Sequence, residues 1–202
     1  IEEDWPGGGP TMSFEGMVDP REGDFGRALS DALERVPEDV GRVVVSAPAS
    51  VRAARVGAIV GRWRPRFPGD LVLEAVRNDG DVVRAVWPRR IAQAMNATPV
   101  LVTAAGDDAG PRLEVRSLDA WHVSVPSAEF FPTKRTQRAT LPLRTGLRDL
   151  ARVLREERER YERAYDLGLV NLAPALTFSA LVELLRVCIA VEPRRLVLSF
   201  GR

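Results

Sequence analysis

Three arginines alternate with aromatic residues in the segment 62–67, which reads Arg-Trp-Arg-Pro-Arg-Phe. Guanidinium groups bind phosphate oxygens through paired hydrogen bonds, and aromatic rings offer nucleic-acid bases a surface on which to stack. The proline inside the segment and the one just after it favour an extended backbone, from which side chains can project. The predicted nucleic-acid-binding residues of this segment are Arg62, Trp63, Arg64 and Arg66. In the alternative interpretation, Trp63 and Phe67 fill the hydrophobic core and the arginines are only solvated.

A second basic segment, residues 133–140, mixes Lys and Arg with Thr and Gln, which commonly donate hydrogen bonds to phosphate oxygens. It leads into arginines spaced by four, which share one face of a helix. The predicted phosphate ligands of this segment are Lys134, Arg135, Arg138, Arg144 and Arg148. One continuous binding surface requires that this segment lies close in space to residues 62–67, about 70 residues away in the chain.

Charge is unevenly divided along the chain, although the formal net charge is only +1. Acidic side chains predominate in residues 1–41, whereas residues 42–69 hold six arginines and no acid. Codon bias explains why Lys134 is the only lysine among 29 basic residues, but it does not explain why the arginines cluster. Such a division predicts a basic surface that attracts a polyanionic partner. The sequence pI of 8.2 is lower than that of many dedicated nucleic-acid binders, which favours a protein partner.

Nucleophilic and metal chemistry have few residues to use. His122 is the single histidine, so a Ser–His–Asp or Cys–His site would depend on it, and Ser124 would share its face of a strand. A hydrogen-bonded structural histidine is the simpler interpretation. Cys188 stands among apolar residues, which is typical of a buried core position. One His and one Cys exclude a structural zinc site, because such a site needs about four ligands of these types.

Acidic pairs in the loops 79–81 and 107–108 are the carboxylates that could hold Mg²⁺ or Ca²⁺. Both fall in predicted turns, where Asp is favoured for backbone reasons alone. The loop 106–110 contains glycines but lacks the Gly-Lys-Ser/Thr ending of a phosphate loop. We therefore expect no catalytic site, no cofactor and no metal, and we keep an enzyme that uses the single histidine as the third functional hypothesis.

Apolar periodicity and turn residues predict the elements that must position these side chains. The expected helices lie at about 24–36, from Ser50 onward, and at 88–95, 145–166 and 174–190. The expected hairpins join 71–76 to 82–87 and 100–105 to 112–116, and further strands are expected at 42–47, 120–125 and 196–200.

This order of elements predicts a single α+β domain over residues 25–202, preceded by a flexible acidic lead-in at 1–24. We expect a mostly antiparallel sheet built from hairpins, with helices packed on one face and long helices towards the C-terminus. A three-layer α/β arrangement is the alternative, because helix and strand alternate in the first part of the chain.

The helix expected at 145–166 carries an apolar stripe at intervals of three, four or seven residues. Its members are Leu147, Leu150, Leu154, Tyr161 and Tyr165. Such a stripe could pair with a helix of a partner, including a second copy of the chain, and the acidic lead-in could dock on a basic surface. These features support a protein-interaction or assembly module as the second functional hypothesis.

No apolar run is long enough to span a membrane, no signal peptide is recognisable, and a single cysteine permits no disulfide framework. An intracellular protein is therefore expected. The first functional hypothesis is a non-catalytic nucleic-acid-binding domain with a regulatory role, which contacts DNA or RNA phosphates through the two basic segments.

Overall fold

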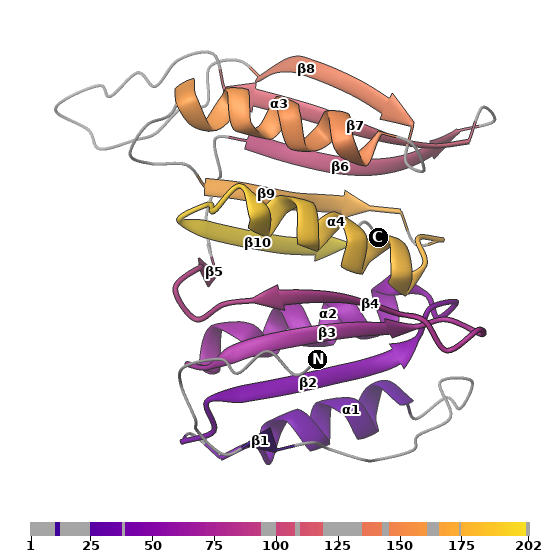
Figure 1. The fold of residues 1–202 in the computed structure, drawn as a ribbon, viewed down its shortest axis with the longest axis vertical. Helices are drawn as coiled ribbons and strands as arrows, with labels where there is room; N and C mark the ends of the chain where they lie inside the picture. The colour runs from indigo at the N-terminus through magenta and orange to yellow at the C-terminus, as the bar shows by residue number, and fades with distance from the viewer. Residues whose placement is uncertain are drawn as a thin grey trace, which may run out of the picture.

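The computed structural model describes residues 11–12, 25–37, 39–93, 100–107, 110–118, 135–142, 146–160, 166–173 and 175–200. These residues form one α+β domain with two mixed sheets and four α-helices (Figure 1), which confirms the expected fold class. The strand expected at 120–125 and most of the lead-in 1–24 lie outside the described residues.

The first sheet has the strand order β1–β2–β3–β4. Its strands are β1 (Thr11–Met12), β2 (Arg42–Pro48), β3 (Asp70–Val76) and β4 (Val82–Trp87). Its helices are α1 (Phe25–Glu34) and α2 (Ala53–Trp63), and a 3₁₀ turn, η1 (Arg64–Arg66), follows α2. The strands β1, β2 and β3 pair in parallel. For β2 and β3 the reason is that α2 carries the chain back along the sheet between them.

The hairpin between β3 and β4 forms as the sequence predicts, with antiparallel pairing. Gly80 has a φ of 87°, in the left-handed region that glycine adopts without a steric penalty. The Asp79 carboxylate accepts a hydrogen bond from the backbone N–H of Asp81 at 3.1 Å. Asp79 therefore stabilises the turn, which is the backbone role expected for an Asp at this position.

The second sheet has the strand order β5–β10–β9–β6–β7–β8. Its strands are β5 (Ala92–Gln93), β6 (Val100–Asp107), β7 (Gly110–Leu118), β8 (Arg135–Pro142), β9 (Asp166–Leu172) and β10 (Arg195–Phe200). Its helices are α3 (Leu147–Arg160) and α4 (Phe178–Ala190). The Thr177 hydroxyl caps α4 by accepting a hydrogen bond from the Ala180 N–H at 3.3 Å. The predicted hairpin forms as β6 and β7.

Antiparallel pairing does not predominate, which corrects the expectation drawn from the two hairpins. The strands β5, β10, β9 and β6 pair in parallel, and only the β6–β7–β8 part of the second sheet is antiparallel. The reason is that α4 joins β9 to β10, and such a crossover returns the chain in the same direction. The alternation of helix and strand, on which the alternative arrangement was based, therefore predicts strand direction better than the two hairpins do.

Three segments differ locally from the prediction. Pro88–Ile91 forms a turn where a helix was expected, because side chains use its carbonyls: the Trp87 indole N–H donates to the Ile91 oxygen at 3.0 Å. Residues 135–142 form β8, a strand that the sequence pattern did not predict. Residues 166–172, which follow the expected 145–166 helix and were not predicted to form a strand, form β9 through pairing with β10 and β6.

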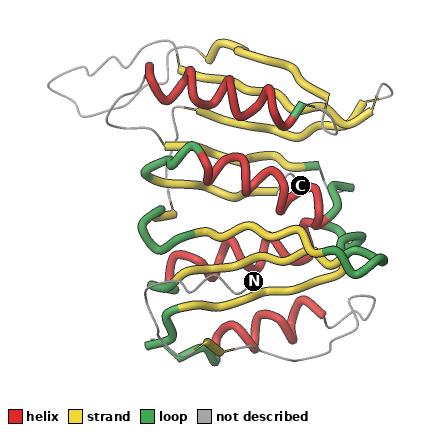
Figure 2. The backbone as a smooth tube through the Cα atoms, in the orientation of Figure 1, coloured by secondary structure: helices red, strands yellow, loops and turns green. Residues whose placement is uncertain are grey.

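The helices of the two sheets lie on opposite sides of the molecule. In Figures 1 and 2, α2 lies behind the first sheet, whereas α3 and α4 lie in front of the second. In addition, α4 packs against β3 and β4, and α2 packs against β10. Gly57 permits this approach, because a Cβ atom there would lie 2.5 Å from the Phe200 ring. One hydrophobic core therefore extends through both sheets.

Candidate functional site

The first basic segment lies where α2 ends. Arg62 stands in the last turn of α2, Arg64 is its C-cap residue, and Arg66 ends η1. A helix C-terminus carries a partial negative charge, which a nearby cation stabilises by roughly 0.3–1 kcal/mol. This stabilisation is a structural reason for arginines to lie at the end of α2, and it does not depend on a ligand.

Arg64 is buried, with 4% of its surface exposed. Its guanidinium donates hydrogen bonds to the backbone carbonyls of Phe67 and Pro88, and it lies 5.5 Å from the centre of the Trp87 ring. Burial lowers the pKa of Arg64, and the charge of the nearby Asp70 opposes that shift. The side chain therefore fastens η1 to the loop after β4 and offers little surface to a phosphate.

Trp63 and Phe67 stack on one another, with ring centres 4.5 Å apart and ring planes 19° from parallel. Phe67 is buried in the core, as the alternative interpretation expected, whereas Trp63 is half-buried. The stack fixes the orientation of the indole ring, so that Trp63 presents a rigid flat surface.

A pocket of about 180 Å³ lies between α1 and the end of α2, and we call it the α1–α2 pocket. Residues of both helices and of η1 line it: Ser30, Leu33, Glu34, Ile59, Arg62, Trp63 and Arg66. The apolar Leu33 and Ile59 are buried, whereas Glu34, Arg62 and Arg66 are exposed. The structure thus brings together three of the four residues predicted in segment 62–67.

The second basic segment lies in β8 and α3. Arg135 begins β8, and Arg138, farther along this strand, pairs with the buried Glu157 of α3 at 3.4 Å. Arg148 is exposed on α3. Lys134 and Arg144 lie outside the described residues. The charge of Arg138 therefore ties β8 to α3.

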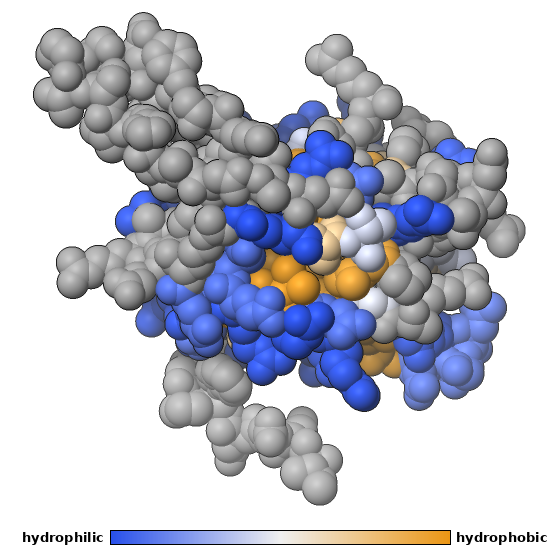
Figure 3. Space-filling model, turned by 90° about the horizontal axis from the view of Figure 1, so that it is seen from above, coloured by the Kyte–Doolittle hydropathy of each residue, from blue (hydrophilic) through white to orange (hydrophobic). Residues whose placement is uncertain are grey.

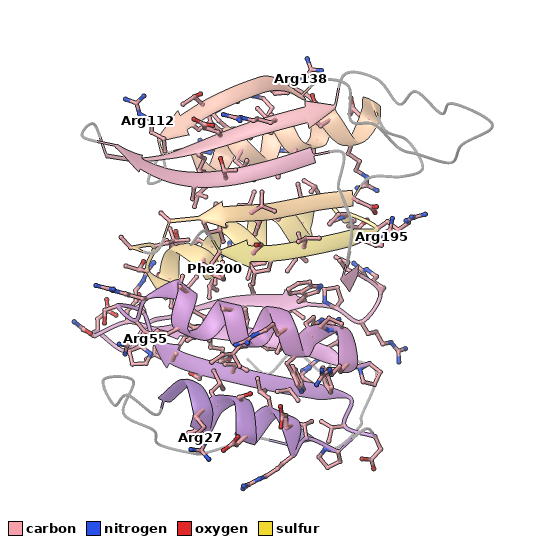
Figure 4. The ribbon with its side chains drawn as sticks, turned by 180° about the vertical axis from the view of Figure 1, so that it is seen from behind. Arg27, Arg55, Arg112, Arg138, Arg195 and Phe200 are labelled. Atoms are coloured by element: carbon pink, nitrogen blue, oxygen red, sulfur yellow. The ribbon has the colours of Figure 1, made fainter. Side chains whose placement is uncertain are left out.

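The described parts of the two basic segments lie on different parts of the fold. β8 stands at the outer edge of the second sheet, and the strands β7, β6 and β9 separate it from β10, against which α2 packs. Neighbouring strands lie about 4.8 Å apart, so the separation of β8 from β10 is roughly 19 Å. In Figure 4, Arg138 lies near one end of the molecule and Arg55 of α2 lies in the other half. Seen from the β8 end, the described surface is mainly hydrophilic around a small apolar area (Figure 3).

The leucine stripe of α3 faces inward. Leu150 and Leu154 are fully buried, Leu147 is half-buried, and α3 packs against α4, β7 and β8. Tyr161 and Tyr165 lie outside the described residues. The stripe therefore contributes to the core of this chain, which accounts for its apolar character without a partner helix.

The part of the chain that the structure describes contains no group of three His, Cys, Asp or Glu side chains that could hold a metal ion. Cys188 is fully buried, as expected, and its burial raises the pKa of the thiol, so that it is a poor nucleophile. His122 lies outside the described residues. None of the described helices is both long and apolar enough to cross a membrane.

Sequence reasoning did not anticipate the role of α1. Ser30, Leu33 and Glu34 were read only as part of an amphipathic helix, yet they form one side of the α1–α2 pocket.

Exposed valines were also missed: Val82 and Val86, with 47% and 40% of their surface exposed, are the exposed large hydrophobics of the described residues. The sequence did contain a signal for this, because β4 has valines on both of its faces. A strand with one face in solvent usually has polar residues on that face.

Comparisons with models of protein families, with curated proteins and with solved structures found no match to this chain.

Proposed function

We propose that this chain is a non-catalytic protein-interaction module, which holds an acidic segment of a partner protein at the α1–α2 pocket. The observation that carries the proposal is the pair of exposed guanidinium groups at the rim of the pocket, those of Arg62 and Arg66. Within the described part of the chain, neither forms an ion pair with a carboxylate. Together with Glu34, the two arginines leave the pocket lining with a net positive charge beside an aromatic wall, and this attracts an anionic ligand.

Several other arginines of the described residues already form ion pairs within the chain. Arg77 pairs with Glu183 at 3.1 Å and Arg84 pairs with Glu74 at 2.6 Å. Arg62 and Arg66 are instead open to a carboxylate from outside. Exposed ion pairs between a guanidinium and a carboxylate contribute roughly 0.2–1 kcal/mol each, so two such contacts together contribute up to about 2 kcal/mol to the binding free energy.

The groups at the pocket are held in place before any ligand arrives. The Nε atom of Arg62 donates to the carbonyl of Ala58 at 3.2 Å, which leaves its terminal nitrogens for a ligand. Trp63 is fixed by its stack on Phe67. Groups that are already ordered lose less conformational freedom on binding, and this increases affinity.

Nucleic-acid binding is the competing proposal. It depends on several phosphate contacts from the two basic segments together, and the separation of β8 from β10 leaves only Arg62 and Arg66 of the first segment at the pocket. Two arginines at one pocket match a short acidic segment better than a long phosphate backbone. The number of charges released on binding distinguishes the two functions, because each phosphate contact adds about 0.7–0.9 to the log–log salt slope.

The test is a fluorescence-anisotropy titration of the whole chain with a dye-labelled acidic peptide, and in parallel with labelled single-stranded DNA, duplex DNA and RNA, at several salt concentrations. We expect the peptide to bind with a shallow salt slope and to bind at least tenfold more weakly to the Arg62→Gln/Arg66→Gln variant. The matched control is Arg27→Gln/Arg52→Gln, which removes the same charge from exposed arginines outside the pocket.

Equal weakening by the two double variants would show that only net charge matters, and the proposed function would fail. Nucleic-acid binding with a slope of several units, together with no binding of the peptide, would establish the competing function instead.

A further inference from the structure

We infer that the α1–α2 pocket accepts one aromatic side chain, a Trp or Tyr, from a peptide segment in which carboxylates stand next to that residue. This inference rests on the proposed function and specifies the partner: the ring enters the pocket while the adjacent carboxylates bind Arg62 and Arg66.

The size of the pocket fits one aromatic ring. Its volume is about 180 Å³, and a cavity of about 150 Å³ lined by aliphatic and aromatic side chains is known to hold benzene. The pocket opens to solvent, so the rest of the ligand can continue outside it. The pocket therefore selects for a single planar group on a flexible chain, which an aromatic side chain supplies.

The lining of the pocket changes from apolar to charged between floor and rim. Leu33 and Ile59, with 4% and 8% of their surface exposed, form the apolar part, and the indole of Trp63 forms a flat wall. A ring placed there buries apolar surface and stacks against Trp63, and aromatic pairs contribute beyond their buried area. The exposed guanidiniums of Arg62 and Arg66 lie outside this part, where groups flanking the ring would reach them.

Glu34 and Ser30 add hydrogen-bond acceptors to the same lining. An acceptor beside an apolar slot favours a ring that carries a donor, which is the indole N–H of Trp or the phenol O–H of Tyr, over the ring of Phe. A Phe ring would leave the Glu34 carboxylate without a partner from the ligand and would also lower its hydration. The pocket therefore distinguishes Trp and Tyr from Phe through Glu34.

Glu34 also argues for a peptide over a nucleotide. A terminal phosphate group bound by Arg62 or Arg66 carries about 1.5 to 2 negative charges close to the Glu34 carboxylate, whereas a carboxylate in the same place carries one, so Glu34 repels a peptide less strongly. A peptide can place its carboxylates on the arginines and direct neutral N–H donors towards Glu34. The chain itself contains such an order of residues, since three acids precede Trp5 at positions 2–4.

The test is a titration of the whole chain with the labelled peptide Glu-Glu-Asp-Trp-Pro-Gly-Gly and with four relatives, in which Trp is replaced by Tyr, Phe or Ala, or the acids are replaced by Gln and Asn. The Trp5→Ala chain is titrated in parallel, so that its own Trp5 does not compete with the added peptide. We expect the Trp and Tyr peptides to bind at least tenfold more tightly than the Ala peptide and several-fold more tightly than the Phe peptide. The uncharged peptide should bind at least tenfold more weakly than its acidic parent.

Glu34→Ala supplies the sharpest readout, because it should remove the preference for Trp over Phe while the Ala peptide still binds weakly. Asp31→Ala is its matched control, since Asp31 is exposed on α1 but does not line the pocket. Urea denaturation confirms that each variant remains folded.

Equal binding of the Trp and Ala peptides would overturn this inference, and the proposed function would survive if the acidic peptides still required Arg62 and Arg66. A preference for Trp that persists unchanged in Glu34→Ala would also overturn the assigned role of Glu34. No binding of any peptide to either chain would overturn the inference and the proposed function together.

Discussion

The contact between α2 and the end of β10 gives a prediction in which a substitution changes sign. In the intact chain, a Cβ atom at Gly57 would lie 2.5 Å and 2.7 Å from two ring carbons of Phe200 and 2.9 Å from a methyl carbon of Leu181. Overpacking of this kind costs about 1–3 kcal/mol, whereas replacing Gly by Ala inside a helix contributes about 1 kcal/mol. We therefore expect Gly57→Ala to destabilise the chain by about 1 kcal/mol.

In a Phe200→Ala background the two nearest atoms are absent, and the next nearest belongs to the flexible end of the Leu181 side chain. The helix-propensity term should then predominate, so Gly57→Ala should stabilise that chain by about 0.5–1 kcal/mol. The coupling between the two positions should therefore be at least about 1 kcal/mol, which a double-mutant cycle measured by urea denaturation resolves.

The matched control is Gly41→Ala, because a Cβ atom at Gly41 meets nothing within 4 Å. This change should be neutral or slightly stabilising in both backgrounds. If Gly57→Ala had the same effect with and without Phe200, the close packing of α2 on β10 would be refuted, and with it the argument that one core extends through both sheets.

Further predictions concern a buried arginine, the buried cysteine and two exposed valines. Arg64→Met should lower the free energy of unfolding by about 2–3 kcal/mol, because the buried carbonyl of Phe67 and the partly buried carbonyl of Pro88 lose their donor. Arg66→Met should change it by less than about 0.5 kcal/mol, and equal effects of the two changes in urea denaturation would contradict the burial of Arg64. Cys188 keeps its proton in the folded chain at pH values where the unfolded thiol, with an ordinary pKa near 9.0, has lost it. The free energy of unfolding should therefore fall as the pH rises above 9, and this fall should be smaller in Cys188→Ala. A thiol that reacts quickly with a disulfide reagent in the native chain at pH 8 would disprove the burial of Cys188. The double change Val82→Thr/Val86→Thr should leave the unfolding free energy within about 0.5 kcal/mol, and a larger loss would show that these valines are covered.

Elements with local causes could be predicted from the sequence. The β3–β4 hairpin depends on a glycine at positive φ and on an Asp side chain that bonds its own turn, and both signals lie within five residues. The inward stripe of α3 follows from helical spacing in the same way, with Leu150 and Leu154 fully buried. These features need no information from distant parts of the chain.

Elements with nonlocal causes were missed. Residues 166–172 have no strong strand pattern, and they form β9 because β10 and β6 supply hydrogen-bonding partners on both sides. The parallel direction of these strands depends on where α4 crosses, which is a property of the whole fold. β8 likewise gains its position from β7 and from the ion pair between Arg138 and Glu157, residues 19 positions apart.

In the candidate site too, neighbouring residues with the same sequence signal take different positions, because the fold offers them different contacts. Arg62, Arg64 and Arg66 look alike in the sequence, but Arg64 turns inward because the carbonyls of Phe67 and Pro88 are there to receive its donors. Arg62 and Arg66 stay outside and share the pocket with Trp63. Changes at Arg64 should therefore affect stability first, while changes at Arg62 or Arg66 should affect binding of an acidic ligand and leave stability nearly unchanged. A chain with Arg64→Met that stayed as stable as the parent but no longer bound the acidic peptide would reverse this assignment, because it would place the inward arginine at the ligand.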